Sequence, residues 1–328
     1  PETWTPDHAI LRWRRNTFFP KMEAMTILRV QHLGIVVRDL SDATERFERI
    51  FGLKAQAIVG DEEKRKHRDA RILLGNECWL HLVQSWDPDS RASRFLEERG
   101  EGLEHIAIET GDIGGEVARL RSNGIRVWQD KIFDRSDGYG AFVYPDQLPG
   151  LTVELIQPHE NSWGYPGDAV GKPISSVLDL VRLHHFGLVV ENLQDACKRF
   201  EEVLGLSARD FRDDQGQGMQ YDARILFPNH CWLHLVQNWN PESRVNRFLR
   251  SRGEGLDHIA IQTSDIQADV AYLRGNDIPI FCDEILNAAD GFESFVYPDQ
   301  LPGMTVELIQ PHAHSWSFPE EAFPSPTD

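Results

Sequence analysis

Six histidines and two glutamates recur in pairs that lie 153 residues apart in the chain. The pairs are His32 and His185, His81 and His234, His105 and His258, and Glu154 and Glu307. Within each copy the spacing is regular as well, since 49 residues separate His32 from His81 and also His105 from Glu154. Imidazole nitrogens and carboxylate oxygens together suit Fe, Mn, Co, Ni or Zn as divalent ions. The pattern therefore predicts one metal site with four protein ligands in each copy.

The residues around these positions alternate in the way that β-strands require. In the segment Cys78–Val83, His81 shares a face with Trp79 and Val83, while Cys78, Leu80 and Leu82 face the other way. Glu154 stands between Val153 and Leu155, and a carboxylate in so apolar a strand needs a charged partner, which a metal ion would provide. A single histidine on such a strand is more often a hydrogen-bonded core residue. The repetition of all four positions is what favours metal binding.

The chain is a tandem duplication with a second, fainter repeat inside each copy. Residues 69–108 recur as 222–261, and residues 142–159 recur as 295–312, without insertion or deletion. This predicts an N-terminal arm at 1–27, a first domain at 28–159, a linker at 160–180, a second domain at 181–312 and a tail at 313–328. Inside the first copy, the strand-like segment that begins at His32 is echoed by one that begins at His105.

Each of the shorter repeats predicts a β-α-β-β-β module. A strand is followed by a capping Asp or Ser, by a helix such as the one whose apolar residues are Ala43, Phe47 and Ile50, and by three further strand segments. The fold class is therefore α+β, with four modules in two domains. Each module is expected to form a curled mixed sheet with a helix on one face, and paired modules are expected to enclose a cleft, with two ligands from each module.

Composition limits the partners. The formal net charge of −18 disfavours nucleic acids and anionic membranes, and no apolar run is long enough to span a bilayer. The four cysteines form no CxxC pair, and no signal peptide is evident, so a cytoplasmic location is expected. The expected partner is a small-molecule substrate. Arg71 and Arg224 indicate that this substrate is anionic. The tandem pair predicts a monomer with internal pseudo-symmetry or a homodimer.

Two segments carry a resemblance to a known family, namely SRFLEERGEGLEHIA at 93–107 and TVELI at 152–156. They resemble the vicinal oxygen chelate superfamily, which includes glyoxalases, bleomycin resistance proteins and dioxygenases, and within it especially the methylmalonyl-CoA epimerases. The resemblance covers residues 28–159 and again 181–312. It implies that the eight repeated residues are metal ligands, and that Glu154 or Glu307 takes a proton from a substrate whose enolate the metal stabilises.

The chain departs from the epimerases at two positions in each copy. His81 and His234 stand where epimerases usually carry glutamine, and Arg71 and Arg224 stand where they place a catalytic carboxylate. An arginine that faces a metal cleft is a candidate clamp for a carboxylate, phosphate or enolate oxygen. The alternative for Arg71 is a surface ion pair with Asp69 or a neighbouring acid.

Three functional classes remain open on the sequence. The first is a metal-dependent isomerase, epimerase or lyase. The second is a non-heme Fe(II) dioxygenase, because four-module chains resemble extradiol and 4-hydroxyphenylpyruvate dioxygenases, in which two histidines and one carboxylate hold iron. The third is a metal-free resistance protein that sequesters its ligand. The copies also differ near the expected cleft mouth, where His67 and Arg68 correspond to Gln220 and Tyr221, which indicates two clefts of different preference or one that has degenerated.

Overall fold

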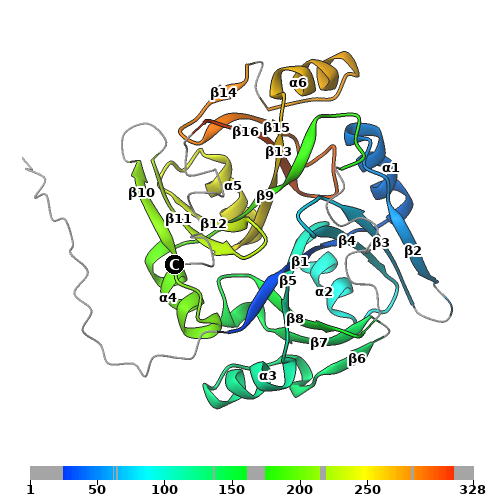
Figure 1. The fold of residues 1–328 in the computed structure, drawn as a ribbon, viewed down its shortest axis with the longest axis vertical. Helices are drawn as coiled ribbons and strands as arrows, with labels where there is room; N and C mark the ends of the chain where they lie inside the picture. The colour runs from blue at the N-terminus through cyan, green and yellow to red at the C-terminus, as the bar shows by residue number, and fades with distance from the viewer. Residues whose placement is uncertain are drawn as a thin grey trace, which may run out of the picture.

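Two similar halves follow one another along the chain, each built on one eight-stranded mixed sheet (Figure 1). The computed structural model describes residues 25–61, 63, 66–135, 137–160, 174–214, 219–281 and 284–313. Most of the predicted arm, linker and tail lies outside these residues.

The first sheet has the strand order β2-β3-β4-β1-β5-β8-β7-β6. Its centre is an antiparallel pair, β1 with β5, and each of these pairs in parallel with the last strand of its own module, β4 or β8. The strands are β1 (Ile27–Val36), β2 (Gln56–Asp61), β3 (His67–Leu73), β4 (Trp79–Ser85), β5 (Gly102–Thr110), β6 (Phe133–Arg135), β7 (Gly138–Val143) and β8 (Thr152–Pro158). The predicted β-α-β-β-β modules are thus present.

The second sheet repeats this order as β10-β11-β12-β9-β13-β16-β15-β14. Its strands are β9 (Leu180–Val189), β10 (Arg209–Asp214), β11 (Gln220–Phe227), β12 (Cys231–Asn238), β13 (Gly255–Thr263), β14 (Leu286–Asn287), β15 (Gly291–Val296) and β16 (Thr305–Pro311). In both halves the two modules share one continuous curled sheet. The sheet is continuous because the first strands of the two modules, β1 with β5 and β9 with β13, hydrogen-bond directly.

The helix of each module follows its first strand. These helices are α1 (Leu40–Phe51), α3 (Ile113–Ser122), α4 (Leu193–Leu204) and α6 (Ile266–Gly275). In α1 the side chain of Asp39 caps the first turn by accepting from Ser41 N and Asp42 N, and Gly52, with φ of 67°, ends the helix in the left-handed conformation. Leu40, Ala43, Phe47, Ile50 and Phe51 are buried, so α1 packs one apolar face on the sheet as its periodicity predicts.

Two further helices connect the modules, α2 (Arg91–Arg99) and α5 (Arg244–Arg252), and short 3₁₀ turns lie at Trp128–Asp130 and Pro145–Gln147. Helix α5 packs Val245, Phe248 and Leu249 on Val189 and Val236 of the sheet. Because Val189 and Val236 lie on the sheet face opposite the main core, α2 and α5 cover the face that carries the repeated histidines.

Strand alternation separates the apolar core from this histidine face. Leu80 and Leu82 on β4 and Cys78 just before it are fully buried in the core, as predicted, and so are Val153 and Leu155 on β8. The intervening side chains therefore project from the other face of the sheet. The candidate ligands His81 and Glu154 are on this face, and so are His234 and Glu307 in the second half.

The two halves contact one another through equivalent residues. Asn76 Nδ2 donates to Leu183 O and Asn229 O, at 3.1 and 2.9 Å, and Asn229 Nδ2 donates to Val30 O and Asn76 O, at 3.0 Å each. Asn76 and Asn229 occupy the same place in the two copies, so these contacts are related by internal pseudo-symmetry.

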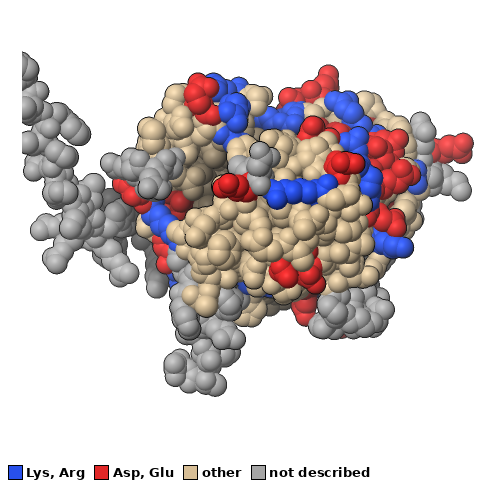
Figure 2. Space-filling model, turned by 90° about the horizontal axis from the view of Figure 1, so that it is seen from above, with Lys and Arg blue, Asp and Glu red and all other residues tan. Residues whose placement is uncertain are grey.

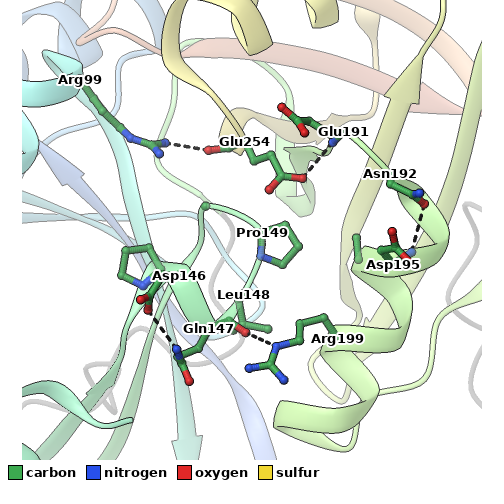
Figure 3. Close-up of a pocket in the computed structure, with 13 residues that line it drawn as sticks. Arg99, Asp146, Gln147, Leu148, Pro149, Glu191, Asn192, Asp195, Arg199 and Glu254 are labelled. Carbon is green, nitrogen blue, oxygen red and sulfur yellow. Dashed lines mark hydrogen bonds between the residues drawn. The ribbon is translucent and has the colours of Figure 1, made fainter. Parts of the chain in front are cut away.

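A groove of about 580 Å³ also lies where the halves meet, between the turn at Pro145–Gly150 and α4 (Figure 3). At this groove Arg199 Nε donates to Gln147 O at 2.8 Å, and Arg99 Nη1 donates to Glu254 O at 2.8 Å (Figure 3). The halves are therefore joined by polar contacts on two sides of the molecule.

Acidic and basic side chains are interspersed on the face shown in Figure 2, so the acidic excess is not concentrated in one field there. Among the described residues, every helix is too short or too polar to cross a bilayer.

Candidate metal centres

The four predicted ligands of the first copy come together on four neighbouring strands, β4, β1, β5 and β8. Ring nitrogens of His32, His81 and His105 lie within 4.8 Å of one another. Glu154 Oε2 lies 3.4 Å from His32 Nε2 and 3.3 Å from His105 Nε2. We refer to His32, His81, His105 and Glu154 as the first centre.

The second copy has the same arrangement. Ring nitrogens of His185, His234 and His258 lie within 4.8 Å of one another, and Glu307 Oε2 lies 3.6 Å from His185 Nε2 and 3.7 Å from His258 Nε2. These four residues form the second centre. In both centres the described donors are three nitrogens and one carboxylate, a set that suits a divalent transition metal.

A glycine makes the close approach of the histidines possible. Gly34 lies between His81 and His105 in the sheet register, and a Cβ atom on it would lie 1.9 Å from His105 Cε1. Gly187 holds the same place beside His258, also with 1.9 Å to Cε1. Any other residue would therefore displace the ring. The His-x-Gly spacing is the sequence signal for this requirement.

Burial favours the neutral form of four of these imidazoles, because it lowers their pKa. It lowers the pKa of His32 well below its usual value, and burial together with the charge of Arg91 lowers the pKa of His105 to about 4. In the second centre burial likewise lowers the pKa of His185 and His258. A neutral imidazole is the form that binds a metal, so no proton has to be displaced from these rings at neutral pH.

An acidic residue orients one histidine of each centre. His105 Nδ1 is 2.7 Å from Glu104 Oε2, and His258 Nδ1 is 3.0 Å from Asp257 Oδ2. Such a bond fixes the ring and leaves Nε2 for the ion. Arg91 of α2 pairs with Glu104, and Arg244 of α5 pairs with Asp257. The sequence analysis missed all four residues, although each pair also recurs at the 153-residue spacing.

The arginines predicted to face the centres do so. Arg71 on β3 lies opposite His81 on β4, and Arg224 on β11 lies opposite His234 on β12. Each arginine therefore shares a sheet face with the candidate metal ligands of its half. Arg71 is buried, with Nη2 at 3.5 Å from Asp137, and Arg224 pairs with Asp290. The alternative, an ion pair with Asp69 or a neighbouring acid, is met in part, because Arg71 pairs with Asp137, although its guanidinium is buried and not at the surface.

The two centres differ in what surrounds the glutamate. Glu154 Oε1 accepts from Arg135, a residue that sequence reasoning missed because Ala288 occupies its place in the second copy. Burial raises the pKa of Glu154, but Arg135 and the two histidines outweigh this effect and hold it well below its usual range. In contrast, burial and the neighbouring Glu293 raise the pKa of Glu307 well above its usual value.

The fold and these paired centres define the class of protein. A sequence model of the Glyoxalase/Bleomycin resistance protein/Dioxygenase superfamily matches residues 31–143 and 184–297, more than half of the chain. The chain belongs to this superfamily, once in each half.

Individual relatives are similar to parts of the chain or to its whole fold. The protein YqjC of Bacillus subtilis (strain 168) is 30% identical over 135 residues, covering 40% of this chain and 92% of that protein. The mitochondrial methylmalonyl-CoA epimerase of Homo sapiens is 29% identical over 133 residues, covering 39% and 73%. A mutant 4-hydroxymandelate synthase from Streptomyces coelicolor matches with a TM-score of 0.68 at 16% identity, covering 88% of this chain and 94% of that one, which shows a shared fold.

Proposed function

We propose that this chain is a divalent-metal-dependent enzyme that acts on a small substrate with two chelating oxygens, by proton transfer next to a carbonyl or carboxylate. The observation that supports it is the convergence of three imidazoles and one carboxylate at each of two points. In an octahedral ion, four protein ligands leave two positions, enough for two oxygens of one substrate. Bound there, a divalent ion would act as a Lewis acid on the substrate oxygen.

The residues of the chain have defined roles in this proposal. His32, His81, His105 and Glu154 hold the ion in the first half, as His185, His234, His258 and Glu307 do in the second. Glu154 and Glu307 are also the candidate bases, because each is the one carboxylate that contacts the histidines of its centre.

Arg71 and Arg224 are candidate clamps for an anionic substrate group. Each lies opposite a histidine of its centre, and a guanidinium can hold two oxygens at once. Burial lowers the pKa of both arginines to about 10, so both stay charged at neutral pH.

Metal analysis of the purified protein tests this proposal most directly. We expect about two divalent ions per chain by mass spectrometry, and about one after His81→Ala or His234→Ala. The matched control is His159→Ala, which removes a histidine that bonds Asp134 outside the centres and should leave the content unchanged. A protein that takes up no transition metal under any of these conditions would refute the proposal.

A dioxygenase is the second candidate, favoured by the fold shared with 4-hydroxymandelate synthase over 88% of the chain. In that case His81 and His234 would leave the ion, so that two histidines and one carboxylate hold iron. Two assays separate the reactions. Deuterium exchange into methylmalonyl-CoA under nitrogen indicates proton transfer, and oxygen uptake with 4-hydroxyphenylpyruvate indicates a dioxygenase. Metal retained in His81→Ala together with oxygen uptake would favour the dioxygenase.

A further inference from the structure

The two centres carry opposite charges on the hairpin next to their glutamates. In the first half, Arg135 on β6 reaches Glu154, and Gly140 on β7 has no side chain. In the second half the equivalent positions are Ala288 and Glu293. The second half therefore lacks the cation of the first half and carries an anion on the neighbouring strand.

Geometry explains why these two substitutions occur together. A Cβ atom on Gly140 would lie 2.6 Å from Arg135 Nη2 and 3.0 Å from Glu154 Oε1, so a side chain there would require the Arg135 guanidinium to move. In the second half the alanine removes this obstacle. Glu293 then occupies a strand position whose Cβ is directed at the carboxylate of the centre.

The sheet register places Glu293 on the ligand face. Phe295 pairs with Glu307 and Glu293 pairs with Ile309, so Glu293 and Glu307 are diagonal neighbours on the same face of β15 and β16. Glu293 is partly buried, and its surroundings include Asp290, Arg224 and Arg212. Both arginines are already paired with Asp290, Arg212 Nη2 at 2.5 Å.

A second observation concerns Glu307 itself. Its side chain is only 6% exposed, and Oε1 has no hydrogen-bond partner among the described residues, whereas the corresponding oxygen of Glu154 accepts from Arg135. A buried carboxylate oxygen without a donor is costly unless a cation approaches it. At the first centre the guanidinium of Arg135 provides this charge and thus competes with a metal ion for Glu154.

We propose that Glu293 gives the second centre a second carboxylate, and that this centre therefore binds a divalent cation more tightly than the first. The inference rests on the proposed function, since it assumes that both centres bind metal. It assigns unequal roles to them. In the first centre, the positive charge of Arg135 would attract an anionic substrate group. In the second centre, the added carboxylate lowers the net positive charge around the ion.

The experiment measures Mn²⁺ binding by isothermal titration calorimetry on full-length variants in which one centre is disabled. His105→Ala leaves the second centre, and His258→Ala leaves the first. We expect the second centre to bind Mn²⁺ about 10- to 100-fold more tightly, the range that residues next to metal ligands typically contribute. In the His105→Ala background, Glu293→Gly, which restores the first-copy residue, should remove most of this difference.

Two further variants keep the test decisive. Glu293→Gln preserves the size of the side chain and should weaken binding as Glu293→Gly does, even if the glycine variant folds poorly. In the His258→Ala background, Arg135→Ala should tighten binding at the first centre. Glu284→Gln removes an exposed acid ahead of the same hairpin and serves as the control for a general charge effect.

The outcomes distinguish this inference from the proposed function. Equal affinities at the two centres, or an affinity that Glu293→Gln leaves unchanged, would overturn the inference while metal dependence stands. Failure of both centres to bind Mn²⁺, Co²⁺ or Zn²⁺ would overturn both.

Discussion

At the scale of single residues, each centre depends on charges that are buried but paired. Asp257 is 6% exposed and contacts both Arg244 and His258. Burial by itself raises the pKa of Asp257, but Arg244 and the hydrogen bond with His258 outweigh it and lower the pKa from 3.8 to about 2. The ionised carboxylate is therefore more stable in the folded chain than in the unfolded chain.

This shift predicts a pH-dependent effect of Asp257→Asn. Because the folded-state pKa lies below the unfolded value, the stabilisation is fully present above about pH 4 and is lost as the pH falls toward 2. We expect the variant to lose about 2 kcal/mol of unfolding free energy at pH 7 and progressively less between pH 4 and 2. Urea unfolding with a metal chelator present measures this difference.

The control for Asp257 is Asp134→Asn, whose side chain is 71% exposed where it pairs with His159. An exposed pair should change stability by less than about 1 kcal/mol. A loss at Asp257 that stays constant down to pH 2 would contradict the electrostatic explanation.

The cysteines give a second prediction at this scale. Burial raises the pKa of Cys78 to about 12 and raises that of Cys231 well above its usual value. Since the thiolate is the reactive form, iodoacetamide at pH 8 should label neither residue until the chain unfolds. Peptide mapping by mass spectrometry, with urea-unfolded protein as the positive control, checks this, and rapid labelling of the native chain would show the sites to be accessible.

The sequence predicts residues that repeat better than residues that differ. The eight candidate ligands recur at a spacing of 153 residues, and the fold brings them together in two groups of four. Arg135 and Glu293 could not be found by that criterion, since each exists in only one copy. Their effect on the centres depends on strand register and on the space between β6 and β7. Both are seen only in the three-dimensional structure.

At the scale of elements, the first strand of each module must pass close to its neighbours. Gly34→Ala should push the His105 ring away from the first centre, because a Cβ atom would lie 1.9 Å from Cε1. We expect this variant to lose the metal of the first centre and retain that of the second. The metal content per chain, measured by mass spectrometry, should fall from about two to about one.

A glycine in open space provides the comparison for Gly34. A Cβ atom on Gly275, at the end of α6, would have no described atom outside its own helix within 4 Å. Gly275→Ala should keep both ions and change stability by less than about 1 kcal/mol. Full metal retention in Gly34→Ala would mean that the ring can relax without losing the site.

Helices that bury several apolar residues were predictable from the sequence, whereas helices that bury few or none were not. Helix α1 buries five residues and was predicted from their spacing, but α2 buries none and α5 buries only Val245. These two connecting helices therefore gave little signal. The merging of two modules into one sheet also escaped prediction, because the pairing of β1 with β5 joins segments that are distant in sequence.

At the scale of the whole molecule, Asn76 and Asn229 connect the halves by donating to backbone carbonyls of the opposite half. Replacing either by alanine leaves carbonyl oxygens at the interface without donors, so we expect each variant to lose roughly 1–3 kcal/mol of unfolding free energy. Since the two side chains belong to one network, the double variant should deviate from additivity by about 0.5 kcal/mol or more.

Urea unfolding of the two single variants and the double variant measures this coupling. The exposed residue Asn123, whose side chain bonds only within its own helix end at α3, is a suitable control. Strict additivity of Asn76→Ala and Asn229→Ala would show that the halves are joined mainly by their apolar surfaces.

The succession of two copies in one polypeptide has a consequence for how such a protein can evolve. In a symmetric homodimer one gene encodes both subunits, so a mutation that changes one site changes the equivalent site as well. Here the duplicated gene segments mutate separately. Arg135 and Gly140 in the first half correspond to Ala288 and Glu293 in the second half, and this is such a one-sided difference. Because the two copies are fused in one chain, each half can specialise while both keep the same fold.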